Sequence, residues 1–140
     1  MKLYKTLECL SYWFRYQATY LEMKYHLKQV MKGKEEYYIK TTDPYDRNIG
    51  KSVALARLSV KYNIPIVVPT NIWSDVIVKD IPKYLPKYFK KKLPKTIVIN
   101  ENMRGRKYDV LLLEECLSED QMNVVNYVTC GKVVGYKNVY

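Results

Sequence analysis

The fold of this chain is decided by residues 36–69, which read EYYIKTTDPYDRNIGKSVALARLSVKYNIPIVVP. The short aromatic and β-branched run at 36–41 predicts a strand, and Asp43-Pro44 with the polar residues after it predicts a loop. Residues 51–62 have the apolar spacing of a helix of about three turns. The apolar run at 64–69 does not alternate, which is typical of a parallel strand covered on both faces. The stretch therefore predicts a strand–loop–helix–strand unit.

The loop of this unit has the residues that phosphate binding needs. A bound phosphate requires backbone N–H donors, the positive end of a helix and a lysine that reaches the outer phosphates. Gly50 lets the backbone approach, and Asn48 is among the few other residues that tolerate a left-handed conformation. Lys51 would hold the phosphates, and the Ser52 hydroxyl would bind Mg²⁺. The sequence therefore predicts a P-loop at the junction of strand and helix.

A second segment supports this interpretation. Residues 109–113 form an apolar strand that ends in Glu114 and Glu115. Acids at the end of a buried strand beside the loop can hold the Mg²⁺ shell through water and polarise an attacking water. We therefore predict Glu114 and Glu115 as the catalytic residues, with Asp109 too early on the strand for this role.

The loop also departs from the usual P-loop pattern. Tyr45 stands where that pattern begins with Gly or Ala, and the loop from Thr41 to Gly50 is long and contains Pro44. A tyrosine at this position either covers a nucleotide or fills the site. We therefore leave enzyme activity open, with weak ATP hydrolysis as the activity that the motif would support.

Residues 1–31 predict an amphipathic helix ending at Gly33. Its apolar stripe comprises Leu3, Leu7, Leu10, Phe14, Ala18, Leu21 and Tyr25. We expect this stripe to cover one face of the sheet, with a docking helix or a dimer seam as the alternatives.

The rest of the chain continues the alternation of strands and helices. Residues 73–78 suit either a strand or a helical turn, and 79–95 predict a basic loop carrying a short helix. Strands are expected at 96–99 and 132–135, and Ser118 begins a helix. This order predicts an α/β fold, namely a P-loop NTPase-like, mostly parallel sheet flanked by helices. We expect a single domain over 1–140, with the helix at 1–31 and the α/β core at 36–140.

The amino-acid composition limits the kinds of partner, metal site and cellular location that we expect. The formal net charge of +10 favours polyanions such as nucleic acid, nucleotides or an acidic protein, although the same charge also serves solubility. Cys9, Cys116 and Cys130 have no metal-ligand spacing and predict buried thiols in a reducing cytosol. His26 is the only histidine, which excludes a histidine-built metal site. Neither a signal peptide nor a membrane-spanning run is visible, so we expect a cytoplasmic protein without membrane contact.

The basic segment from Lys79 to Lys95 is a candidate nucleic-acid surface. Tyr84, Tyr88 and Phe89 are interleaved with its lysines and would stack on bases. The alternative is a solvated loop whose aromatic residues tuck under the domain. Arg104 and Arg106 are further candidates for phosphate or inter-subunit contacts.

Several of these segments together resemble a known family. They are Lys40-Thr41, residues 46–52, 61–63 and 64–69, residues 103–108 before the Leu-rich strand with its two Glu, and residues 133–136. They are similar to small P-loop ATPase-like proteins encoded by bacteriophages and prophages of Firmicutes. The resemblance covers Lys40 to the C-terminus and includes the N-terminal helix. It implies ATP and Mg²⁺ binding through Lys51 and Ser52, with an acidic pair at Glu114 and Glu115. Asn48 replaces a Gly of that family.

Two functions follow from the sequence. The first is a nucleotide-binding, ATPase-like protein acting in phage DNA metabolism inside the host cell. The second is a non-catalytic phage protein on a degenerate P-loop fold. It would inhibit either a host defence protein, in the manner of an anti-CRISPR, or a host protein that handles nucleic acid. The expected partners are a nucleotide, a host or phage protein, and nucleic acid through Lys79–Lys95.

Overall fold

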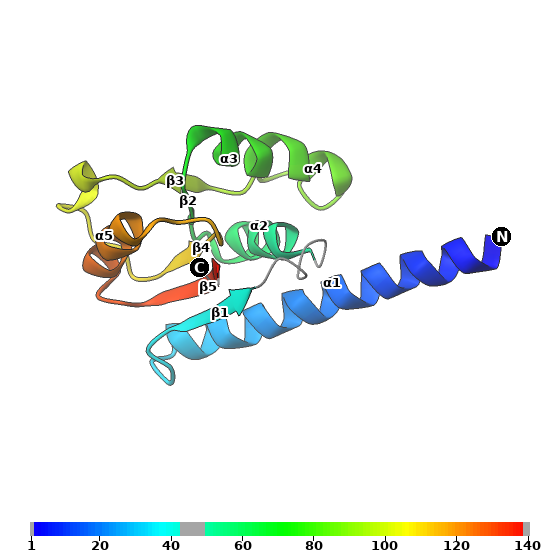
Figure 1. Cartoon of the computed structure of the whole chain (residues 1–140), viewed down its shortest axis with the longest axis horizontal. Coiled ribbons are helices and arrows are strands. Elements are labelled where there is room, and N and C mark those ends of the chain that lie inside the picture. The colour runs from blue at the N-terminus through cyan, green and yellow to red at the C-terminus, as the bar shows by residue number, and fades with distance from the viewer. Residues whose placement is uncertain (1, 43–49, 139–140) are drawn as a thin grey trace.

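A computed structural model describes residues 2–42 and 50–138 of the chain. Its centre is a five-stranded sheet in which every pair of neighbouring strands is parallel, in the order β1-β5-β4-β2-β3 (Figure 1). The strands are β1 (Tyr38–Thr42), β2 (Ile66–Val68), β3 (Thr96–Val98), β4 (Leu111–Leu113) and β5 (Val133–Asn138). The predicted α/β class, a parallel sheet flanked by helices, is confirmed.

Helices cover both faces of the sheet. On one face lie α1 (Lys2–Met31), α2 (Lys51–Tyr62), α3 (Asn71–Asp75), the π-helical turn η2 (Val76–Asp80) and α4 (Ile81–Tyr84). On the other lie α5 (Glu119–Thr129) and the 3₁₀ turn η3 (Glu101–Met103). The strand alternative for residues 73–78 is wrong, because this segment belongs to α3 and η2. The short helix expected in the basic loop is α4.

The long helix α1 is present as predicted and ends before Gly33, which has a φ of 74°. Its orientation differs from the prediction. The core-facing side chains are Tyr20, Met23, Leu27 and Val30, whereas the stripe predicted from Leu3 to Tyr25 is exposed. The reason is that α1 carries two stripes with helical spacing that face roughly 140° apart, and only the second faces the sheet. Leu21 and Tyr25 of the first stripe lie among the core-facing residues in sequence and are still exposed. The first half of α1 extends beyond the body of the protein (Figure 1).

The connections place a topological switch point at the centre of the sheet. The chain leaves β2 through α3, η2 and α4 on one face and reaches β3, whereas it leaves β4 through α5 on the other face and reaches β5. Since β2 and β4 are neighbours, the two connections diverge at their carboxyl ends. Open α/β sheets bind ligands at such a point.

Two further predictions concern the surface. The three thiols are free, but Cys9 and Cys130 are exposed, so the prediction of buried thiols is wrong for these two. Cys9 lies on the projecting half of α1, and Cys130 follows the last turn of α5. In the described part of the chain, no helix is both long and apolar enough to cross a bilayer.

Candidate functional site

The carboxyl edge of the sheet collects most of the residues predicted for the site. Thr42 is the last residue of β1, Lys51 and Ser52 begin α2, and Glu114 and Glu115 directly follow β4. Although β5 lies between β1 and β4, the side chains meet across it. The predicted juxtaposition of the phosphate-loop residues with the acidic pair is therefore present. Asn48, the remaining predicted binding residue, lies outside the described residues.

Lys51 is a buried cation at this edge. Its side chain is only 7% exposed, and its Nζ donates a hydrogen bond of 2.9 Å to Oε2 of Glu115. The same oxygen accepts a 2.8 Å hydrogen bond from Oγ1 of Thr42. The ammonium also lies 5.9 Å from the ring centroid of Tyr136 on β5. Because a buried charge needs a partner, Glu115 balances Lys51 in this structure.

Glu114 is the more deeply buried of the two acids, at 1% exposure. Its Oε2 accepts a 3.1 Å hydrogen bond from the Ser52 hydroxyl. Burial raises the pKa of Glu114 to about 7, while hydrogen bonds from the Glu115 amide and from Ser52 oppose that rise. The site thus contains a carboxyl group that gains or loses its proton near neutral pH.

The N-terminus of α2 supplies further donors. Gly50 precedes the helix with a φ of 77°, and the first helical hydrogen bond runs from the Ala54 amide to the Gly50 carbonyl at 2.9 Å. The amides of residues 51–53 come before that bond, at the positive end of the helix dipole. Tyr16 of α1 packs on Gly50 so closely that a Cβ there would lie 2.7 Å from Tyr16 Cδ2.

Tyr16 is itself held in place by α2. Its hydroxyl accepts a 2.8 Å hydrogen bond from Nη1 of Arg57, and the guanidinium of Arg57 also lies 3.9 Å from the ring centroid of Tyr20. Burial raises the pKa of Tyr16, against the lowering effect of Arg57. The start of α2 is therefore fixed against α1 by an aromatic side chain.

The side chains of Lys51, Ser52 and Glu114 have the chemistry that a phosphate with a bound Mg²⁺ ion requires. The Ser52 hydroxyl and the Glu114 carboxylate are oxygen ligands, which Mg²⁺ prefers, and it usually keeps several waters and phosphate oxygens besides one or two carboxylates. Among residues 2–42 and 50–138, no group of three or more His, Cys, Asp or Glu could hold a metal by itself.

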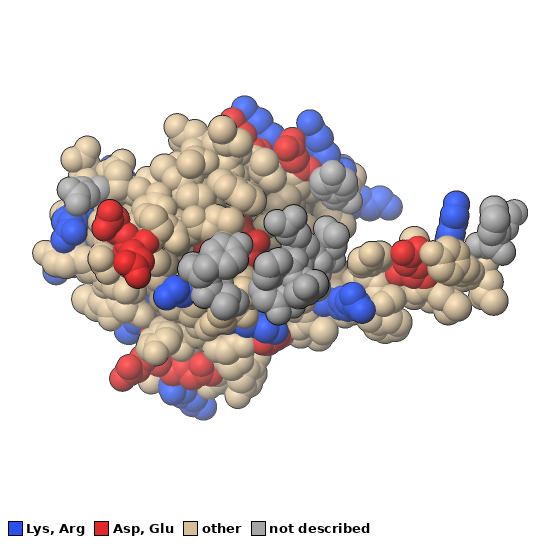
Figure 2. Space-filling model, viewed as in Figure 1, with Lys and Arg blue, Asp and Glu red and all other residues tan. Residues whose placement is uncertain are grey.

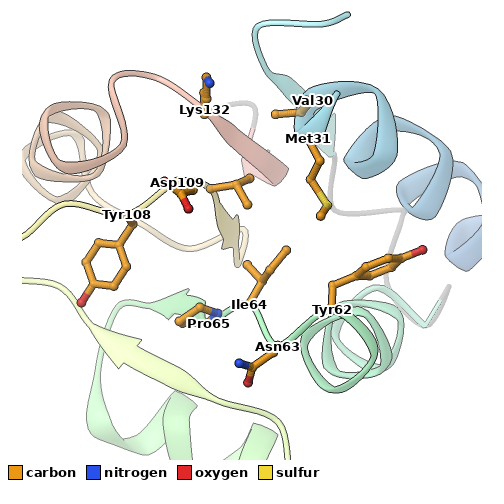
Figure 3. A pocket seen from close by; sticks show the side chains of 10 residues that line it. Val30, Met31, Tyr62, Asn63, Ile64, Pro65, Tyr108, Asp109 and Lys132 are labelled. Carbon is orange, nitrogen blue, oxygen red and sulfur yellow. The ribbon is translucent and has the colours of Figure 1, made fainter. Parts of the chain in front are cut away.

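Two cavities flank the sheet at different edges. A groove of about 970 Å³ lies between α5 and the strands β1 and β5, and it adjoins the site through Cys116 and Asn138. Asn138 contacts both Thr42 and Cys116. A cavity of about 510 Å³ lies at the amino ends of β2, β4 and β5, where Tyr62, Tyr108 and Asp109 line it (Figure 3). Asp109 thus belongs to the edge opposite Lys51, in agreement with its exclusion from the acidic pair.

The other predicted contact residues lie away from this edge. The guanidinium of Arg104 lies 5.7 Å from the ring of Tyr127, near the end of α5 that leads to the amino edge of the sheet. Arg106 follows in the segment before β4. Neither residue is brought to Lys51.

The basic segment 79–95 keeps its lysines at the surface. Lys79 and Lys83 pair with the exposed acids Asp75 and Asp80, and Figure 2 shows Lys and Arg side chains gathered above α3 and α4. Phe89 is buried at 4% exposure, so its predicted role in base stacking is wrong. Tyr88 lies against Arg57 at 4.8 Å, and the side chain of Tyr84 lies outside the described structure. For Phe89 the tucked-under alternative holds.

Sequence reasoning missed three residues of the site. Thr42 ends the strand that was predicted at 36–41, so the rule that parallel strands end at one edge would have found it. Tyr136 has its ring beside Lys51 and is 1% exposed, and burial raises its pKa. No local signal marks Tyr136 or Tyr16, because both reach the site through the packing of distant segments.

Comparison of the chain with family models, with curated proteins and with solved structures gives no match.

Proposed function

We propose that this chain binds a nucleoside triphosphate with Mg²⁺, as a P-loop-like protein, at the carboxyl edge of its sheet. The observation that carries the proposal is the buried ammonium of Lys51 at the N-terminus of α2, in contact with one acid while the adjacent Ser52 contacts the other. A lysine is almost never fully buried unless it is paired, and the partner of Lys51 is a carboxylate on a partly exposed side chain. Here the lysine stands beside the amides of a helix end, which favour a negatively charged ligand.

The site offers a clear exchange of partners for Lys51. The Glu115 side chain is 22% exposed, so its carboxylate has access to water. A phosphate oxygen would take the place of Glu115 on the ammonium, while Thr42 would continue to hold the released carboxylate. Such an exchange keeps the buried cation paired throughout, which avoids the penalty of an isolated charge.

Ser52 and Glu114 would hold the Mg²⁺ ion. The ion would supply neutralisation of the phosphate charge. Glu114 must lose its proton to serve as a ligand, and its pKa of about 7 places that loss near neutral pH. Glu115, once released from Lys51, is the residue that would accept a hydrogen bond from an attacking water. Hydrolysis therefore rests on Glu115, and binding rests on Lys51.

The groove of about 970 Å³ beside the site is large enough for the nucleoside part of the ligand. Its lining combines apolar side chains such as Ile39 and Met122 with the polar groups of Asn123 and Asn138. Such a mixture suits a base and a ribose. Under this proposal, ATP gains affinity over bare triphosphate through the groove.

The proposal is tested by calorimetric titration with ATP, ADP, AMP and inorganic tripolyphosphate, each with Mg²⁺. Affinity should rise with the number of phosphates, and ATP should bind more tightly than tripolyphosphate. Equal affinity for ATP and AMP would contradict a phosphate-centred site, as would no binding of any of them at millimolar concentration. For hydrolysis, Glu115→Gln should lose phosphate release while keeping ATP binding.

The pairing of Lys51 with Glu115 also favours a second candidate function, because it balances the lysine charge without any ligand. It is the non-catalytic interaction protein, in which the P-loop-like scaffold presents a basic surface to a host defence protein or a host nucleic-acid-handling protein. The exposed Lys87, Lys90, Lys91 and Lys92 after α4 would supply that surface. Absence of nucleotide binding together with salt-dependent binding of a polyanion would favour this candidate.

A further inference from the structure

Residues 3–21 of α1, most of them on its projecting half, carry a heptad seam that no other part of the described structure covers. Leu3, Leu7, Leu10, Phe14 and Leu21 occupy the apolar positions of an alternating four-and-three spacing, and Gln17 completes the series between the last two. This is the a/d repeat of a coiled coil. The five apolar side chains are between 45% and 72% exposed.

The seam points away from the body of the protein. At 3.6 residues per turn, its centre lies roughly 140° around the helix from the stripe formed by Tyr20, Met23, Leu27 and Val30. That second stripe packs on α2 and the sheet. The two stripes therefore serve different partners, and a helix docked on the seam would not collide with the domain. Figures 1 and 2 show the corresponding half of α1 standing free of the body.

A helix exposed in this way needs a partner. Every residue from Leu3 to Arg15 is exposed, and most of the stability of a helix in a protein comes from packing of its apolar face. Trp13 and Tyr4 flank the seam and are also exposed. Aromatic side chains bury about 150–250 Å² each. Together with the leucines, they bring the apolar area to the scale of the roughly 800 Å² per partner that a stable interface buries.

We propose that the seam binds the same helix of a second copy of this chain, in a parallel two-stranded coiled coil. A heptad seam is self-complementary, because each knob fits a hole of an identical helix. The repeat ends where the next positions are Lys24 and Lys28, so the seam is limited to residues 3–21. The two globular bodies lie on the outer sides of this coil.

Gln17 decides whether the two helices of the coiled coil run parallel or antiparallel. In a parallel pair Gln17 faces Gln17, and the two side-chain amides can hydrogen-bond across the interface. An antiparallel pair with all layers matched puts Leu3 opposite Leu21 and Gln17 opposite Leu7, which buries two amides without partners. Burying an unpaired amide costs about 1–3 kcal/mol. A single polar residue in the seam is also a known way to set register.

The association is tested by sedimentation velocity on the full chain at 1–100 μM, a range chosen on the order of protein dimer affinities. Wild type should be a dimer, Leu10→Glu should be a monomer, and Tyr12→Glu should remain a dimer. Tyr12 is a matched control because it is exposed on the opposite side of the same turn. A monomeric wild type, a dimer that survives Leu10→Glu, or a tetramer would overturn the proposal. Near-ultraviolet circular dichroism checks that each variant keeps the native core.

The direction is tested by disulfide trapping. In a Cys9→Ser, Cys130→Ser background that keeps Gln17, Leu3→Cys should form a covalent dimer on mild oxidation, because the two copies of residue 3 face one another in a parallel pair, whereas an antiparallel pair places residue 3 opposite residue 21. Tyr12→Cys in the same background should not. A dimer by sedimentation that Leu3→Cys fails to trap, or that Tyr12→Cys traps equally, would contradict the parallel arrangement.

Discussion

Lys51 and Glu115, 64 residues apart in the sequence, form an ion pair at the carboxyl edge of the sheet, with Nζ 2.9 Å from Oε2. The pair joins the first turn of α2 to the end of β4 and spans the position of β5. It gives a buried lysine a counter-ion and leaves that counter-ion accessible to water. The proposed exchange of Glu115 for a phosphate follows from this asymmetry.

Removal of the Glu115 side chain should destabilise the protein, because it leaves the buried ammonium of Lys51 without a counter-ion. In Glu115→Ala the ammonium of Lys51 loses its partner, so we expect a loss of unfolding free energy on the order of 3 kcal/mol. Mg²⁺ and ATP should restore more stability to this variant than to wild type, because the phosphate supplies the missing charge. Urea unfolding with and without ligand measures both. Glu36→Ala, which removes an exposed acid, is the control and should change little; equal ligand effects in wild type and Glu115→Ala would contradict the exchange.

Glu114 should make stability depend on pH. Its pKa is raised from 4.5 to about 7 on folding, so the folded state binds more protons than the unfolded state between these values. Stability contributed by this group is therefore complete below pH 4.5 and is lost as the pH rises through 7. The Glu114→Gln variant has no carboxyl group to titrate here, so it does not lose this stability as the pH rises. Its free energy of unfolding relative to that of wild type should therefore increase by on the order of 3 kcal/mol between pH 4.5 and 8.

Urea unfolding of both proteins at several pH values checks this expectation. The Gln side chain matches the size of Glu114 and, like the protonated carboxyl group, carries no charge, so packing is closely matched. A difference between the two proteins that stays constant with pH would show that Glu114 is not protonated on folding.

Gly50 should resist substitution for two separable reasons. Its φ of 77° disfavours any other residue, and a Cβ would press on Tyr16. Gly33 is a matched control, since its φ is 74° and nothing lies within 4 Å of its Cβ position. Gly33→Ala should cost about 1 kcal/mol, and Gly50→Ala should cost more. Thermal unfolding of the two variants tests the order; equal losses would show that Tyr16 yields without cost.

The folded protein should be more stable when Tyr136 lacks its hydroxyl group. The oxygen is buried and has no hydrogen-bond partner in the described part of the chain. Tyr136→Phe removes a hydroxyl group that is buried without a compensating hydrogen bond. We therefore expect its free energy of unfolding to increase by about 1 kcal/mol. Tyr38→Phe is the contrasting variant, because Tyr38 donates a hydrogen bond to Glu22 and should lose stability when that bond is removed. Destabilisation by both variants in urea would mean that Tyr136 has a partner.

Much of the fold could be predicted because its signals are local. The apolar runs became β2, β3 and β4, and Ser118 forms the capping box with Gln121 that begins α5. The meeting of Lys51 with the acidic pair could also be predicted, since parallel strands end at one edge.

The remaining features depend on tertiary contacts. Spacing alone gave two stripes on α1, and it could not tell which would meet the sheet. The strand order puts β5 between β1 and β4, which no local pattern encodes. Likewise, the sequence of the basic segment left open whether Phe89 stacks at the surface or tucks under the domain, and only its packing in the core decides this.

The central claim is tested most directly by titrating Mg²⁺ and ATP into Lys51→Met and Lys61→Met by calorimetry. Both variants remove one lysine charge from α2 and retain an apolar chain of similar length, but Lys51 is buried at the edge and Lys61 is exposed. The account predicts saturable binding by wild type and Lys61→Met, and a loss of at least tenfold in affinity, about 1.4 kcal/mol, in Lys51→Met. Equal binding by the two variants, or none by wild type, would contradict a phosphate site at Lys51.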